Sequence, residues 1–102
     1  MTTLDLTLEK DIETKLVKLI KRHGGLCLKW VCPGWLGVPD RLCLLPGGRI
    51  YFVETKRPKG GKYSKMQNKW RDWLQELGFW YLRVHNSDHL QLLELLILDE
   101  VK

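Results

Sequence analysis

Two apolar segments of strand-forming residues, 40–45 and 49–56, are separated by only three residues, 46–48. A three-residue loop with glycine at its left-handed position is a favoured hairpin connection, and Gly48 fits that position. The sequence therefore predicts an antiparallel hairpin whose register is strongly specified, since a slip of one residue would move every side chain to the other face. In the predicted register, Leu45 opposes Arg49, Cys43 opposes Tyr51 and Asp40 opposes Glu54.

This register brings charged side chains together at the open end of the hairpin. Opposed residues share a face with Cβ atoms about 4.5–5.5 Å apart, so Asp40 and Glu54 lie side by side. Lys56, two residues beyond Glu54, points to the same face. Two converging carboxylates repel each other unless a cation lies between them. Mg²⁺ suits such a pair because it binds carboxylate oxygens, water and phosphate, and the backbone carbonyl of Thr55 could add a further ligand.

These parts suit the hydrolysis of a phosphodiester bond. A bound divalent ion acidifies water and polarises the scissile phosphate, and the lysine beside it can orient or deprotonate the attacking water. The alternative is structural. Asp40 follows a proline and could start a turn or cap a strand, while Glu54 and Lys56 could form a solvated charge pair on an edge strand.

Helix and strand patterns flank the hairpin on both sides. An apolar helical stripe begins near Thr7, a plausible N-cap, and ends before Gly24. A basic loop, 57–63, follows the hairpin, and Ser64 can cap the helix after it. The predicted elements are a helix over 7–23, strands over 26–32, 40–45 and 49–56, a helix over 64–77 with Trp70, Trp73, Leu74 and Leu77 inward, a strand over 79–84, and a last helix from Ser87 or Asp88.

The order α-β-β-β-α-β-α predicts one compact α/β sandwich around a mixed sheet, with residues 1–102 as a single domain.

The chain carries a formal charge of +5, which is compatible with a polyanionic partner but does not establish one. Its three cysteines form no C-x-x-C pair and indicate free thiols in a reducing compartment. The five tryptophans are expected to be mostly core. No apolar run is long enough to span a bilayer, and the acidic N-terminus does not resemble a signal peptide.

Several segments together resemble a stand-alone VRR-NUC domain of the PD-(D/E)xK nuclease superfamily, of the phage or prophage type. They are "EKDIETKLVKLIKRHGGLCLKWV", "G-x-PDR", "GGRIYFVETK", and "SKMQ" followed by "LGFWYLRV", in the family's order and over about residues 9–84. The resemblance implies a restriction-endonuclease-like, three-layer α/β sandwich. It also implies a helix-borne glutamate, matching Glu9 with Glu13 as the fallback, and a glutamine that braces the site, matching Gln67.

The resemblance thus implies a Mg²⁺- or Mn²⁺-dependent endonuclease that cuts branched, Holliday-junction-type DNA as a homodimer in the cytoplasm, with neither a membrane nor a nucleotide cofactor. Asp40, Glu54 and Thr55 hold the metal, Glu9 assists it directly or through water, and Lys56 and Gln67 complete the catalytic set. Alternatives are a nuclease for flaps, ends or nicks, and a non-catalytic DNA-binding module of the same fold. The expected DNA contacts are Lys29, Arg41, Arg57, Lys59, Lys62, Ser64, Lys65 and Lys69.

Two further surfaces are candidates for binding. Trp35, in the loop before Asp40, could stack on bases at a junction or could be buried. The last helix carries more apolar residues than one buried face requires, and such an excess often marks a subunit interface. Dimerisation through this helix or through a neighbouring sheet edge is therefore a hypothesis.

Overall fold

The structure is a computed structural model that describes residues 9–56 and 62–100, apart from the side chains of Glu9 and Glu100. Its element order is the predicted α-β-β-β-α-β-α. The elements are α1 (Glu9–Arg22), β1 (Leu26–Lys29), β2 (Arg41–Leu45), β3 (Arg49–Thr55), α2 (Lys65–Glu76), β4 (Trp80–Val84) and α3 (Ser87–Glu100). The predicted cap Thr7 lies outside the described residues.

The four strands form one mixed sheet in the order β1-β2-β3-β4. The first three strands are antiparallel, and β4 runs parallel to β3. Parallel neighbours need a crossover connection, and α2 provides it. The predicted hairpin register is confirmed, because Cys43 pairs with Tyr51 and Leu45 with Arg49. Gly48 has the predicted left-handed backbone, with a φ of 74°.

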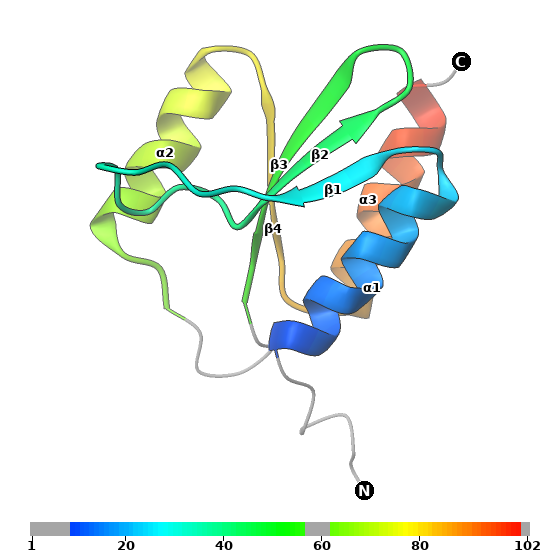
Figure 1. Ribbon diagram of the computed structural model, residues 1–102, viewed down its shortest axis with the longest axis horizontal. Coiled ribbons are helices and arrows are strands. Elements are labelled where there is room, and N and C mark those ends of the chain that lie inside the picture. Colours follow the sequence, from blue (N-terminus) through cyan, green and yellow to red (C-terminus); the bar gives the residue numbers. More distant parts are fainter. Residues whose placement is uncertain (1–8, 57–61, 101–102) are drawn as a thin grey trace, which may run out of the picture.

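Helices cover both faces of the sheet and make three layers (Figure 1). The helices α1 and α3 lie side by side on one face, where they bury the larger apolar cluster. The helix α2 covers the other face with a smaller cluster around Phe52, Leu74 and Tyr81. Strand residues alternate between these faces. Tyr51 and Val53 therefore join the larger cluster, and Phe52 joins the smaller one.

The predicted strand 26–32 is too long, since β1 ends at Lys29. One further backbone hydrogen bond, from Trp30 N–H to the Asp40 carbonyl at 3.0 Å, continues its pairing. The chain then turns at Gly34, whose φ of 87° is incompatible with a strand. Cys32 consequently lies beyond the strand, and all three cysteines are free thiols, as expected.

The helix α2 begins and ends as predicted but buries fewer residues than expected. Ser64 is its N-cap, and Gly78, with a φ of 90°, follows its C-cap. Leu74 is buried, but Leu77 is 72% exposed and Trp73 is 38% exposed. The inward placement of these two residues was wrong, because one helix over a narrow sheet buries only its central stripe.

The expectation that the five tryptophans are mostly core is also wrong. Trp35, Trp73 and Trp80 are exposed, and Trp30 and Trp70 are partly buried. The rings of Trp35, Trp70 and Trp73 contact one another edge-on at the surface, with centroids 5.3–6.2 Å apart. These contacts, rather than burial in the core, hold the loop before Asp40 against α2. None of the described helices is long and apolar enough to cross a membrane.

Candidate active site

Asp40 lies immediately before β2 and reaches across the hairpin to β3. Its Oδ2 accepts hydrogen bonds from the backbone N–H of Thr55 at 2.9 Å and from the Thr55 hydroxyl at 3.0 Å. The last paired residues of the hairpin are Arg41 and Val53, so the next pair outward would be Asp40 and Glu54. The hairpin thus delivers Asp40 to the end of β3, where the sequence placed it.

Glu54 is the most unusual side chain of this region. It is 1% exposed, although it carries a carboxyl group. Burial first, and then the neighbouring Asp40 carboxylate, raise the pKa of Glu54 to about 9. Its Oε2 accepts a hydrogen bond from Gln67 at 3.1 Å, whereas its Oε1 is buried without a partner among the described residues. An orphaned buried oxygen of this kind calls for an explanation such as an ion.

Gln67 belongs to the first turn of α2 and is held there by a capping box. Its Oε1 accepts from the Ser64 backbone N–H at 2.8 Å, and the Ser64 hydroxyl accepts from the Gln67 N–H at 3.1 Å. The amide is thereby oriented with its oxygen toward the helix cap and its Nε2 toward Glu54. The structure brings Gln67 to Glu54, on the same face of the sheet.

Lys56 lies directly after β3 and is half-buried. Its Nζ is 5.6 Å from the centre of the Tyr63 ring, within the range of a cation–π contact. Its positive charge opposes the rise in the Glu54 pKa, which places Lys56 close to the two carboxylates. The structure thus brings Asp40 to Glu54, as predicted, and places Lys56 in their neighbourhood.

The structure describes the side chain of only one of the two candidate glutamates on α1. The side chain of Glu9 lies outside the described part. Glu13, one turn further along α1, accepts a hydrogen bond from the Thr55 hydroxyl at 3.2 Å. It also lies 3.7 Å from Arg41 in an ion pair. Glu13 thus approaches the end of β3 from the α1 side, whereas Glu54 faces α2.

The donor set at the end of the hairpin fits a divalent cation. Asp40 and Glu54 offer two carboxylates, and one oxygen of Glu54 has no hydrogen-bond partner in the part of the chain that the structure describes. Oxygen ligands of this kind are those that Mg²⁺ and Mn²⁺ prefer. Within the described residues, no three His, Cys, Asp or Glu side chains converge. Further ligands would therefore be a backbone carbonyl, such as that of Thr55, or water.

The predicted DNA contacts have unequal surroundings. Arg41 is mostly buried and directed toward Glu13 and the Cys27 carbonyl, the latter at 3.5 Å. Ser64 is occupied as the cap of α2. Four of the predicted lysines are exposed: Lys29 at the sheet edge, Lys62 before α2, and Lys65 and Lys69 on α2. Arg57 and Lys59 lie outside the described residues.

Sequence reasoning did not single out four residues that surround this site. Arg83 pairs in register with Glu54, and the Tyr63 ring contacts both Arg83 and Lys56. Asn68 and His85 hold the two in place. An arginine inside the otherwise apolar strand "FWYLRV" was the available signal. Its neighbours in space, however, are distant in sequence.

Comparison with known proteins agrees with this geometry. A solved structure described as a VRR-NUC domain superposes with a TM-score of 0.78 and is 28% identical, and the match covers 84% of this chain and 94% of that one. The chain has the fold of a VRR-NUC domain. It is also similar to "Putative nuclease p44" of Acyrthosiphon pisum secondary endosymbiont phage 1, with 52% identity over 50 residues. That match spans 49% of this chain and 54% of the phage protein. No family model matches the sequence.

The solved structure and the phage protein together indicate a nuclease of the VRR-NUC type. The resemblance to phage-type VRR-NUC nucleases and the three-layer α/β fold are confirmed, and together they support nuclease function. The metal, the DNA structure and the oligomeric state belong to the proposal that follows.

Proposed function

We propose that this chain is a metal-dependent endonuclease that hydrolyses phosphodiester bonds in branched DNA. One observation carries the proposal. Glu54, whose Oε1 is buried and has no hydrogen-bond partner among the described residues, lies beside Asp40 at the end of a hairpin in a VRR-NUC fold. A second carboxylate beside a buried one is costly unless a cation neutralises the pair. A catalytic metal would provide that cation.

Each residue of the site has a distinct role in this proposal. Asp40 and Glu54 hold Mg²⁺ or Mn²⁺, with the Thr55 carbonyl as a further ligand. When bound, such an ion supplies an acidified water and a polarised phosphate. Gln67 fixes the orientation of Glu54 through its 3.1 Å hydrogen bond. Lys56 positions the attacking water, and Glu9, or Glu13 in its place, assists the metal through water.

The decisive experiment compares the wild type with Asp40→Ala on a four-way DNA junction and on a matched linear duplex, with Mg²⁺, with Mn²⁺ and with EDTA. We expect metal-dependent cutting of the junction, lost in the variant. Equal cutting of both DNAs would keep the nuclease and reject the junction preference, and flap, nicked and blunt-ended substrates would then be compared. Binding of DNA without cutting under either ion would favour the non-catalytic module.

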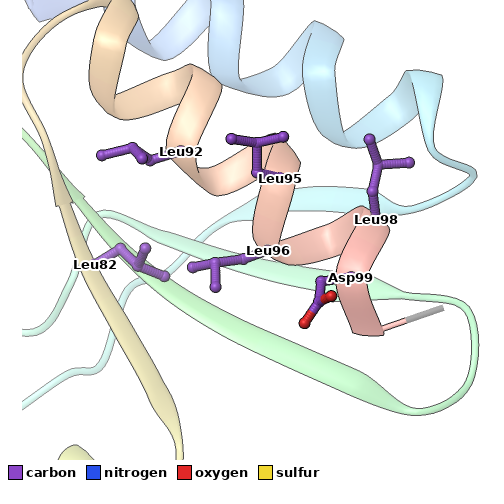
Figure 2. Close-up of a pocket in the computed structure, with 6 residues that line it drawn as sticks. All are labelled: Leu82, Leu92, Leu95, Leu96, Leu98 and Asp99. Atoms are coloured by element: carbon purple, nitrogen blue, oxygen red, sulfur yellow. The ribbon is translucent and has the colours of Figure 1, made fainter. Parts of the chain in front are cut away.

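Homodimerisation through α3 belongs to the same proposal. Leu93 and Ile97 point into the core, but Leu92, Leu95 and Leu98 are 58%, 57% and 48% exposed. Figure 2 shows these three leucines along α3, beside a hollow of about 650 Å³ that Leu82 and Leu96 also line. An apolar row of this kind suits a two-fold contact with the same row of a second copy.

The oligomeric state is tested by measuring the mass in solution at micromolar concentration. We expect a dimer for the wild type and a monomer for Leu95→Glu, which places a charge in the apolar row. Gln91→Glu adds the same charge to an exposed site of the same helix and is the control that should remain dimeric. A monomeric wild type would reject the interface.

We place the enzyme in the cytoplasm of the host cell, where its DNA substrate and free thiols are expected.

A further inference from the structure

A row of polar side chains crosses three neighbouring strands on the face that α2 covers. Asp40 and Glu54 begin the row at the end of the hairpin, and Arg83 continues it on β4, since Glu54 and Arg83 are paired in register. Contacts with α2 confirm the shared face, because Gln67 binds Glu54 and Asn68 binds Arg83. Arg83 is therefore the next side chain along the row from the acidic pair.

The guanidinium group of Arg83 is held from three directions. Its Nη2 donates to Asn68 Oδ1 at 2.7 Å, and its Nε donates to the Tyr81 hydroxyl at 3.1 Å. Its central carbon lies 3.6 Å from the centre of the Tyr63 ring, as in a stacked cation–π contact. Tyr63 is itself fixed by a hydrogen bond between its hydroxyl and His85 Nε2. A long side chain is thus ordered in one place.

These contacts orient the charge of Arg83 without neutralising it. Asn68, Tyr81 and Tyr63 are uncharged, and the ion pairs of the described residues do not include Arg83. A guanidinium carries five N–H donors, of which these contacts use two. The remaining donors of a planar, fixed fork match the oxygens of a phosphate group.

We infer that Arg83 is a substrate-binding residue, which holds a backbone phosphate of the DNA strand next to the acidic pair, and that Tyr63 and Asn68 position it. The inference rests on the proposed nuclease function and adds a cation to that site. Lys56 and Arg83 both contact the Tyr63 ring, at 5.6 Å and 3.6 Å from its centre. The bound strand would therefore meet two positive charges beside the two carboxylates.

The test measures the affinity for a short DNA duplex in EDTA over a range of salt concentrations. Each phosphate contact contributes about 0.9 to the slope of log affinity against log salt. For Arg83→Gln we expect a slope smaller by about 0.9 and an affinity lower by roughly tenfold at low salt. Arg22→Gln removes the same charge at the opposite end of α1, where Arg22 pairs with Glu94, and should leave both values unchanged.

A slope and an affinity for Arg83→Gln equal to those of the wild type would overturn the inference. If that variant does not fold, Arg83→Lys, which keeps the charge but loses the planar fork, replaces it. For Arg83→Lys we expect a weaker affinity in EDTA with little change in the salt slope, and an affinity equal to that of the wild type would overturn the inference. Tyr63→Leu should lower the affinity but keep the slope, because the charge remains. Binding in EDTA needs no cleavage, so a chain that never cuts DNA would reject the proposed function without affecting this comparison.

Discussion

The two faces of the sheet have opposite characters. On the α1 and α3 face, side chains from both helices and from the strands form one continuous apolar cluster, which includes Leu16, Tyr51 and Leu93. On the α2 face, a small apolar cluster around Phe52 extends into the polar row of Asp40, Glu54 and Arg83. The α1 and α3 face buries most of the apolar surface, with one ion pair, Arg41–Glu13, at its edge. The α2 face holds the row of charged groups at the end of the strands.

This difference shows how a chain of 102 residues combines stability with a costly site. Burying a carboxyl group such as Glu54 destabilises the fold, and a small domain has little stability to lose. The larger apolar cluster on the α1 and α3 face offsets that cost. The strand β3 links the two, since Val53 belongs to the apolar face and Glu54, the next residue, belongs to the polar face.

The largest expected effect comes from removing the charge of Glu54 on the α2 face. Glu54→Gln keeps the shape of the side chain but removes a charged metal ligand, so we expect cleavage to fall by at least about 1000-fold. Rates with Mg²⁺ and with Mn²⁺ measure the loss. The control is Glu94→Gln on α3, which removes a partly exposed carboxylate that pairs with Arg22, far from the open end of the hairpin, and should cut normally. A fall of less than tenfold in Glu54→Gln would contradict the role of Glu54 as a metal ligand.

Shortening a buried side chain on the α1 and α3 face should lower the stability of the fold without changing the active site. Leu93 is fully buried, so Leu93→Ala is expected to lower the free energy of unfolding by about 2–5 kcal/mol. Urea denaturation provides the measurement. Leu92→Ala, one residue away and exposed, should stay within about 0.5 kcal/mol of the wild type. Equal losses in the two variants would mean that α3 does not bury the side that the structure assigns.

Gly37 tests the packing of α2 against the loop that precedes Asp40. A Cβ at Gly37 would lie 2.7 Å from the Met66 backbone and 2.8 Å from the Gln67 nitrogen, and its φ is 78°. Overpacking and a left-handed backbone together should make Gly37→Ala cost about 2–4 kcal/mol. The displaced first turn of α2 should also lower cleavage by moving Gln67.

The matched control for Gly37 is Gly34. It has a similar φ of 87°, but an added Cβ would meet nothing within 4 Å. Gly34→Ala should therefore lower the free energy of unfolding only by the strain of a left-handed backbone, about 1–2 kcal/mol. Cleavage should remain intact. Similar losses of stability and of cleavage in both variants would show that close packing of this loop on α2 does not position Gln67.

The smallest expected effect is a pH dependence of stability in EDTA. The pKa of Glu54 is about 9 in the folded protein and near 4.5 when the side chain is exposed. The folded state thus binds an extra proton between these values, and stability should fall as the pH rises from about 5 to 9. We expect a loss on the order of 1–3 kcal/mol in wild type relative to Glu54→Gln, measured by denaturant titration. Parallel curves for the two proteins would mean that Glu54 ionises freely in the fold.

The sequence by itself determined the parts of the molecule that depend on short-range rules. The hairpin register followed from a three-residue turn and an alternating pattern, and both are local. The approach of Asp40 to Glu54 followed from that register. The caps of α2 were predicted for the same reason, because Ser64 and Gly78 act within one helical turn. The register confirmed by Cys43 and Tyr51 shows how much a single turn can specify.

Only the tertiary structure decided which distant residues join the site and which apolar residues stay exposed. Arg83 reaches Glu54 through a parallel pairing across the α2 crossover, and no local pattern encodes that pairing. The exposure of Leu77 and Trp73 depends on how much of α2 the narrow sheet can cover. Packing between elements sets both outcomes, since burial is a property of the surfaces that meet rather than of one helix or strand.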